Sequence, residues 1–344
     1  MRNGVFVKQK HQSQADYVVD SLIAPNRLVL WASIPGEGKS LIGLSLGYHI
    51  AYDIDSFVGM KATTGNVMFI DSENRLDILQ SRIKKVKKGL EMDGYKMAGE
   101  VEFQHFTGFL LDDRQTWQPI EDEVKATPYT LIVLDHLAMF HHQDENKENQ
   151  MKKVTATIED LMALSNASIL VMHHFGKLDT GSFYKRLRGS SAIYAKTDTA
   201  YEVRALSHSD GKLERVGLIP QHRKDITPSA FRVKLEEGQD WLKLVHDGTY
   251  KPIDDPKMDE LSHKFYHQFL EAENNNGITV KDMIQRIKGY ATDTELRTTL
   301  RFLEHNKGLI TSDKKGKGGG FHYRLPPSLH KTKECPWCKQ RSLI

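Results

Sequence analysis

The sequence predicts an α/β protein with a largely parallel sheet, followed by a smaller second domain. Between residue 27 and about residue 245, apolar runs alternate with segments of helical spacing, the pattern of an α/β domain. Several runs are almost continuous in Val, Ile and Leu, as expected for strands that are buried on both faces. A polar segment with two prolines, residues 246–257, then marks a linker to a C-terminal part with a different pattern.

The predicted elements follow one another along the chain. Residues 1–26 are expected to form an N-terminal helix or arm with a turn at Pro25-Asn26. Residues 27–245 form the large domain, in which strand-rich segments after about residue 197 are typical of hairpins that extend the sheet. Parallel strands are expected at 27–33, 66–71, 101–106, 130–135 and 168–174, helices at 41–51, 77–92 and 147–165, and hairpin strands at 198–206, 212–219, 230–238 and 240–245.

The C-terminal part has the pattern of a winged helix, expected over residues 258–326 and followed by a tail, 327–344. Three apolar stripes at helical spacing precede two strands that a Lys/Gly-rich tip connects. The third helix and the tip would bring cations near nucleic-acid phosphates, although winged helices also dock proteins. The apolar stripes are Leu261, Phe265 and Phe269, then Val280, Met283, Ile284 and Ile287, then Leu296, Leu300 and Leu303; the cations are Arg297, Arg301, Lys314, Lys315 and Lys317.

Charge is distributed unevenly along the chain. The net charge of the 344 residues is only +3, but residues 257–344 carry 16 Lys and Arg against 10 Asp and Glu. A basic small domain is a weak indication of nucleic-acid binding. No apolar run approaches the length of a membrane span and no signal-peptide pattern opens the chain, so we expect a cytoplasmic protein without membrane contact.

The two cysteines, Cys335 and Cys338, exclude a disulfide framework and form half of a zinc ribbon. A closed four-ligand site within one chain would need His322, His330 or a partner, so a disordered tail is the preferred interpretation.

Residues 27–40, RLVLWASIPGEGKS, predict a phosphate-binding loop. An apolar strand, a Pro/Gly-rich turn and Gly-Lys-Ser at the start of a helix are the context that such a loop requires. Lys39 would reach the β- and γ-phosphates and Ser40 would hold Mg²⁺, while backbone N–H groups would receive phosphate oxygens. Ser33 stands where the full motif has glycine. The residues expected to hold the nucleotide are Pro35, Gly36, Glu37, Gly38, Lys39, Ser40 and Leu41.

Acids at two strand ends complete the predicted site. Asp135 follows four apolar residues and would lie beside the phosphate loop at the carboxyl edge of the sheet, where it would orient Mg²⁺. Glu73 is the preferred candidate for the carboxylate that orients the attacking water. Asp71, two residues earlier, is the alternative.

Histidines end another buried strand. His173 or His174 could hydrogen-bond the γ-phosphate. His141 and His142 follow the strand of Asp135, so four histidines could gather on one edge of the sheet. Paired histidines also suggest a metal ion, but no further ligand spacing supports one.

These motifs occur in a specific order. GKS, FIDSEN, LIVLDHLAMF, DENKENQM, VMHHFGK and RLRGSSAIY together resemble the RecA-fold ATPases of the plasmid RepA-type hexameric helicases, which are relatives of the DnaB helicases. The resemblance covers residues 25 to about 245 and implies a ring of six subunits with ATP and Mg²⁺ bound between neighbours. It implies that Lys39 and Ser40 hold ATP and Mg²⁺, that Glu73 is the catalytic acid, that Asp135 is the acid on the Mg²⁺ side, and that His174 is the γ-phosphate sensor.

A site between subunits needs an arginine supplied in trans. Arg188 and Arg223 are the candidates. Gln221 stands where DnaB-type proteins have a lysine; either Lys224 substitutes for that lysine or Arg223 acts alone. Residues 176–189 would form a flexible loop facing the central pore, where Lys185, Arg186 and Arg188 could contact single-stranded DNA. Arg188 cannot serve both roles.

The sequence therefore predicts an ATP-driven helicase or translocase on single-stranded DNA, serving the replication of a plasmid, phage or mobile element. A replication initiator, primase or loader is a possible partner. A filament-forming ATPase of the RecA/RadA kind and a KaiC-like, ATP-switched regulator or loader of proteins are the alternatives.

Overall fold

The computed structural model describes residues 17–105, 108–176, 183–188, 192–223, 229–250, 256–271 and 278–286, with short pieces at 299–300, 303–304, 310–314 and 321–324. The chain divides into two compact units, and the division between them falls at Thr249 and Tyr250. Among the described residues, no helix is both long and apolar enough to cross a membrane.

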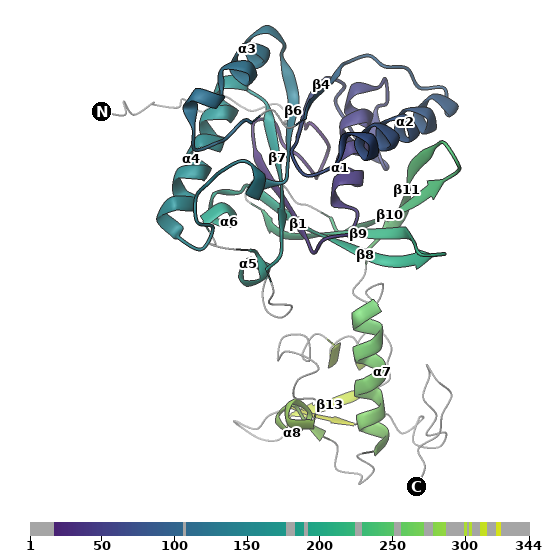
Figure 1. Ribbon diagram of the computed structural model, residues 1–344. Helices are drawn as coiled ribbons and strands as arrows, with labels where there is room; N and C mark the ends of the chain where they lie inside the picture. The colour runs from purple at the N-terminus through teal and green to yellow at the C-terminus, as the bar shows by residue number, and fades with distance from the viewer. Residues whose placement is uncertain are drawn as a thin grey trace, which may run out of the picture. The chain divides into compact units, whose positions relative to one another are not determined.

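The larger unit is built on one nine-stranded sheet with the order β11-β10-β9-β8-β1-β7-β6-β4-β5 (Figure 1). The six strands β8, β1, β7, β6, β4 and β5 run parallel, and β9, β10 and β11 add an antiparallel extension. The strands are β1 (Leu28–Ser33), β4 (Asn66–Asp71), β5 (Val101–His105), β6 (Tyr129–Asp135), β7 (Ser168–His174), β8 (Thr199–Ser209), β9 (Lys212–Arg223), β10 (Phe231–Glu237) and β11 (Leu242–Thr249). The predicted α/β sheet and its hairpin extension are thus confirmed.

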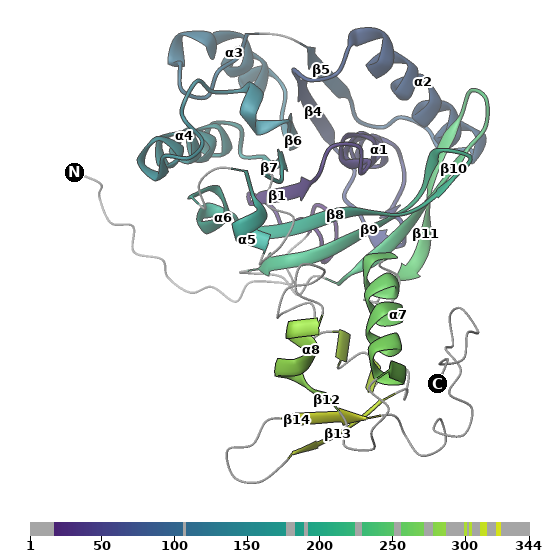
Figure 2. The ribbon, with the colours of Figure 1, turned by 60° about the horizontal axis from the view of Figure 1, so that its bottom comes forward.

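Helices cover both faces of this sheet (Figures 1 and 2). Because successive side chains of a strand point to opposite faces, β1 contributes Val29 and Trp31 to one apolar core and Leu28 and Leu30 to the other. The first core packs against α1 (Lys39–Ala51) and α2 (Leu76–Met92), and the second against α3 (Gln118–Ala126), α4 (Glu148–Ser165) and α6 (Ala192–Lys196). The smaller elements are β2 (Ser56–Phe57), β3 (Met60–Lys61), α5 (Phe183–Arg186) and 3-10 turns at Arg114–Thr116 and Leu137–Met139.

Helix α2 lies directly on the outer hairpin of β10 and β11. A Cβ atom at Gly89 would overlap the carbonyl oxygen of Leu242, so the two backbones approach as closely as glycine allows. Three ion pairs join the same two elements: Lys85–Glu237 at 3.8 Å, Lys88–Asp240 and Lys243–Asp93. The contact fixes the distance between α2 and the hairpin through main-chain atoms.

Residues 17–26 form turns and bridges instead of the predicted helix. Val19 bridges to Ala62 and to Ile23, and the Asp20 N–H donates to the Lys61 carbonyl oxygen at 2.8 Å. These partners take up the backbone groups that a helix would pair within itself. The rest of the predicted N-terminal helix, residues 1–16, lies outside the described residues.

The predicted linker is shorter than expected. Residues 246–249 belong to β11, where His246 pairs with Val233 and Thr249 with Phe231. Helix α7 (Pro256–Glu271) then begins at the second proline.

The smaller unit contains part of the predicted winged-helix pattern. After α7 come β12 (Ile278–Thr279), α8 (Val280–Arg286), β13 (Thr311–Lys314) and β14 (Phe321–Arg324), with the antiparallel sheet order β12-β14-β13. The predicted C-terminal hairpin is therefore present. Most of the predicted third helix, together with Arg297, Arg301, Lys315, Lys317 and the cysteine tail, lies outside the described residues, so the winged helix stays a prediction.

Candidate functional site

The predicted phosphate loop joins the end of β1 to the start of α1. Gly36 and Gly38 have φ values of 89° and 86°, a left-handed conformation that glycine adopts at little cost. Ser33, the departure from the full motif, is the last residue of β1 and pairs with His174 in β7. It lies in extended backbone, so this position of the loop does not require glycine.

Strands β8 and β9 contact the phosphate loop on one side. The Glu37 carboxylate accepts a hydrogen bond from the Ala205 N–H of β8, and burial raises the pKa of Glu37. A Cβ atom at Gly38 would overlap the Leu213 side chain of β9. The Glu37 side chain is thus turned toward the sheet, while the loop backbone remains the part suited to phosphate.

Lys39 and Asp135 meet at the carboxyl edge of the parallel strands. Lys39 Nζ lies 4.0 Å from Asp135 Oδ1, and the two side chains are 4% and 0% exposed. Neither Asp135 oxygen accepts a hydrogen bond from a residue that the structure describes. Burial raises the pKa of Asp135, whereas the Lys39 ammonium and the nearby Ser40 hydroxyl act in the opposite direction. A buried carboxylate with free lone pairs beside a hydroxyl is an oxygen donor set that suits Mg²⁺.

The turn after β4 is organised by Asp71, the alternative candidate acid. Its buried carboxylate accepts hydrogen bonds from the backbone N–H groups of Glu73 at 2.9 Å and Asn74 at 2.8 Å, and from the Asn74 amide at 2.7 Å. Asp71 therefore fixes the backbone that carries Glu73, and the Glu73 side chain is left to face the site.

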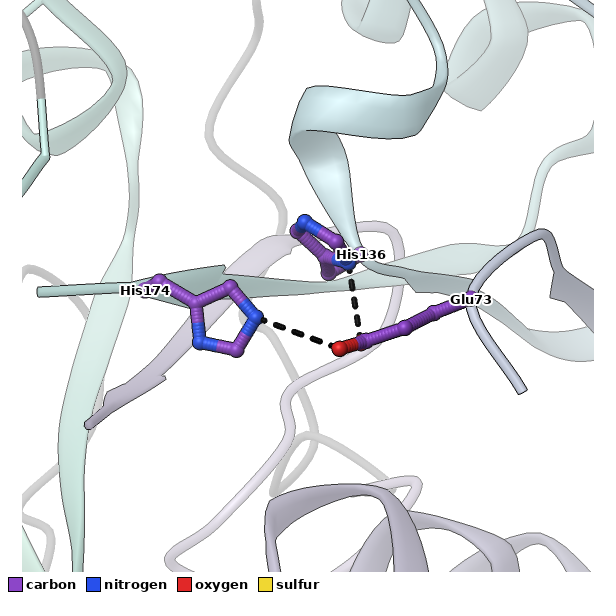
Figure 3. A group of neighbouring side chains, drawn as sticks. All are labelled: Glu73, His136 and His174. Carbon is purple, nitrogen blue, oxygen red and sulfur yellow. Dashed lines mark ion pairs between the residues drawn. The ribbon is translucent and has the colours of Figure 1, made fainter. Parts of the chain in front are cut away.

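Glu73 points toward two histidines from two other strand ends (Figure 3). His136 Nδ1 lies 2.9 Å from Glu73 Oε2, and His174 Nε2 lies 3.6 Å from Oε1. The two imidazole rings contact each other edge to face, with centroids 4.4 Å apart. His136 first, and then His174, hold the pKa of Glu73 well below its usual range, so the carboxylate is ionised at neutral pH.

Sequence reasoning missed His136. The available signal was its place directly after Asp135, at the carboxyl end of a buried strand. The prediction that His141 and His142 would join the strand-end pair is not supported: His136 joins His174, while the buried His141 has Glu145 and Asp112 as its charged neighbours.

His173 faces away from Glu73, as expected for the neighbour of His174 in a strand. His173 is fully buried, and burial lowers its pKa to about 3. Since a carbonyl oxygen only accepts, the neutral ring donates from Nε2 to the Arg188 carbonyl oxygen, 2.9 Å away. The end of β7 thus contacts the Glu73 site on one face and the segment of Arg188 on the other.

Comparison with known proteins identifies the family. The profile described as "AAA domain" matches residues 6–180, just over half of the chain. The chain belongs to this AAA domain family. Membership, together with the phosphate-loop geometry, supports an ATP-hydrolysing P-loop enzyme. Among solved structures, the chain is similar to one whose title describes an "ATPase Domain", with 11% identity, coverage of 64% of this chain and 84% of that chain, and a TM-score of 0.47.

The predicted arginines lie beyond the matched AAA domain, and two of them have partners within the chain. Arg186 is 14% exposed; it donates to Glu202 at 3.0 Å and lies over the Phe175 ring. It belongs to α5, where a flexible loop was expected, and this inward placement does not support the predicted DNA contact. Arg188 is 56% exposed and pairs with Glu145 at 2.7 Å. The side chains of Lys185, Arg223 and Lys314 are outside the described residues.

A hollow of about 440 Å³ lies beside the AAA domain's phosphate loop. Leu41, which follows Ser40, forms part of its wall, and α2 contributes Ile78, Arg82 and Lys85. Leu242 of β11 lies opposite. The hollow is large enough for part of a ligand whose phosphates occupy the loop.

Proposed function

We propose that this chain is an ATP-driven helicase or translocase on single-stranded DNA, which hydrolyses ATP between the subunits of a ring. The observation that carries the proposal is that the Lys39–Asp135 pair and the Glu73 carboxylate lie close enough to interact electrostatically, at one edge of the sheet. ATP hydrolysis requires cations that neutralise phosphate charge and a carboxylate that orients water, and this edge offers residues for both.

Each residue would have a distinct task. The loop backbone and the N-terminus of α1 would receive the phosphates, and Lys39 would bind the β- and γ-phosphates. Ser40 and Asp135 would hold Mg²⁺, which neutralises developing charge on the phosphates when bound. Glu73, kept ionised by its histidines, would accept a hydrogen bond from the attacking water, and His174 would reach the γ-phosphate.

The nucleoside would occupy the hollow beside Leu41. Leu41, Ile78 and Leu242 offer apolar contacts for a flat base. The charged groups of the hollow are balanced: Arg82 and Lys85 are matched by the carboxylates of Asp77 and Glu237, and Lys85 pairs with Glu237 at 3.8 Å. This assignment extends the site from the phosphate loop toward β10 and β11.

An arginine of the neighbouring subunit would complete the site, and we propose a ring of six subunits. Arg188 and Arg223 remain the candidates. Arg188 is more than half exposed although it pairs with Glu145, so a neighbour's nucleotide could compete for its guanidinium. Such an arginine contributes on the order of 10³-fold or more in rate.

The proposed DNA contacts rest on cations and on motif order. Lys185 would contact the single strand within the ring, and the C-terminal cations Arg297, Arg301, Lys314, Lys315 and Lys317 would contact phosphates if that unit is a winged helix. Phosphate contacts make binding weaken as salt rises. The resemblance to RepA-type helicases supports a role in replicating a plasmid, phage or mobile element, with an initiator, primase or loader as partner.

The decisive experiment is steady-state ATP hydrolysis with and without single-stranded DNA, with Lys39→Ala as the matched control. Strong stimulation by DNA that disappears in the variant supports a motor, and unwinding by a ring seen in light scattering would complete the case. Lys39-dependent hydrolysis that is indifferent to DNA would reject the helicase proposal and favour an ATP-switched regulator of proteins. DNA-coating filaments instead of rings would favour a recombination-type ATPase.

A further inference from the structure

We propose that the nucleotide-free chain binds one divalent transition-metal ion, of the Zn²⁺, Co²⁺ or Ni²⁺ class, through Glu73, His136 and His174 (Figure 3). These side chains come from the ends of three strands, β4, β6 and β7, that lie in the same sheet. The sheet therefore brings together three ligands that are far apart in the sequence.

The separations of the ligand atoms suit a small ion. Tetrahedral ligands at about 2.0–2.2 Å from Zn²⁺ lie roughly 3.3–3.6 Å from one another. Glu73 Oε2 lies 2.9 Å from His136 Nδ1, and the other carboxylate oxygen, Oε1, lies 3.6 Å from His174 Nε2. With one ligand atom taken from each residue, the three atoms lie within 4.8 Å of one another. Side-chain rotation alone would bring the three atoms around one ion.

The donor chemistry selects the class of metal. Two imidazole nitrogens and one carboxylate oxygen favour Zn²⁺, Co²⁺ and Ni²⁺ over Mg²⁺, which prefers oxygen ligands. The proposed Mg²⁺ ligands Ser40 and Asp135 supply only oxygen, so the two kinds of ion would prefer different places in one site.

The three proposed ligands differ in their exposure to solvent. The histidine side chains are 9% and 12% exposed, whereas Glu73 is 39% exposed. An ion could enter from the side of Glu73, and a fourth position would remain open to water. If ATP binds as proposed, its γ-phosphate and this ion would compete for the same space, so the ion would inhibit hydrolysis.

A cobalt titration tests the site directly. Because the Cys335 and Cys338 thiols would also bind Co²⁺, the background is the Cys335→Ser/Cys338→Ser chain. We expect the visible absorption of four- or five-coordinate Co²⁺ at one ion per chain, and its loss when Zn²⁺ is added. His136→Ala should weaken Co²⁺ binding by more than about 100-fold, since even outer-shell changes cost 10- to 100-fold.

Two further variants keep the test independent of folding. His142→Ala removes an exposed histidine from the same connection after β6 and should leave the spectrum unchanged. Glu73→Gln, at a half-exposed position, should weaken binding without disturbing the core. Absence of the spectrum, or a spectrum that survives both His136→Ala and Glu73→Gln, would overturn the proposal.

A competition experiment separates this proposal from the ATP proposal. A non-hydrolysable ATP analogue with Mg²⁺ should displace Co²⁺ and remove the spectrum. A Co²⁺ spectrum that the analogue leaves unchanged would uphold the metal site and count against the proposed position of the γ-phosphate.

Discussion

Lys39 Nζ and Asp135 Oδ1 lie 4.0 Å apart, and both side chains are almost completely buried. Asp135 has no hydrogen bond from the described residues to compensate for its burial. The lysine is therefore the main counter-charge of a buried carboxylate in the nucleotide-free chain, and each residue depends on the other.

Removing the lysine should reveal this dependence. Lys39→Met should destabilise the nucleotide-free chain by up to about 3–5 kcal/mol, because it leaves a buried charge without its partner. Adding Asp135→Asn should recover part of that loss. Urea denaturation of the single and double variants measures the effect, and purely additive free energies would contradict it.

Glu73→Gln should separate hydrolysis from binding. An amide of similar shape cannot accept a proton from water, so kcat should fall by about 10²- to 10⁴-fold, while affinity for the ATP analogue should stay within a few-fold. Glu100→Gln, an exposed glutamate before β5, is the matched control. If Glu73→Gln weakens nucleotide binding as much as it lowers kcat, Glu73 is not the residue that orients water.

His136 should act by positioning the Glu73 carboxylate. His136→Ala should lower kcat with little change in KM, because the carboxylate loses the contact at 2.9 Å. His136→Asn, whose amide nitrogen can occupy the place of Nδ1, should restore part of kcat. Steady-state kinetics without transition metals provide both values, and an effect on KM alone would exclude positioning.

His173 should make stability depend on pH. Its folded pKa of about 3 lies below the unfolded value of about 6.5, so only the unfolded chain gains a proton as pH falls below about 6.5. Wild-type stability should then decline relative to His173→Gln by about 1.4 kcal/mol per pH unit. Denaturation of both chains between pH 7 and pH 5 tests this, and parallel curves would contradict it.

Gly89→Ala should destabilise the fold by about 1–3 kcal/mol, because the added methyl group overlaps the Leu242 carbonyl oxygen. Lys84→Ala, at an exposed position of the same helix, should change stability by less than about 0.5 kcal/mol. Thermal unfolding of the two variants gives the comparison; equal midpoints would show that α2 can shift away from β11.

The sequence predicted the parts of the fold that depend on local pattern. The buried runs that became β1, β6 and β7 carry their own signal, and Gly38-Lys39-Ser40 marks the loop because glycine and helix-start chemistry are local. Long-range pairing was harder to predict. Tyr17, Val18 and Asp20 form hydrogen bonds with residues 61–63, and such distant pairing leaves no periodic pattern in the sequence.

In the candidate site, too, features set by local sequence were predicted, whereas features set by long-range contacts were not. The place of Asp135 followed from its strand end, but the approach of His136 to Glu73 depends on two strand ends lying side by side and on the turn that Asp71 holds. Arg186 appeared to be a surface cation in the sequence, yet Glu202 on β8, sixteen residues later, pairs with it in a buried position. Charge in a sequence does not tell which cations have internal partners.

The glycine contact between α2 and β11 has a consequence for the hollow beside Leu41. Ile78, Arg82 and Lys85 form one wall and Leu242 the other, and the two walls are held apart by main-chain atoms at Gly89 and Leu242. Side-chain substitutions can therefore change the polarity and charge of the hollow, but the backbone contact sets the distance between its walls. Preference among bases should be easier to alter by exchanging hydrogen-bonding groups than by enlarging or reducing the walls.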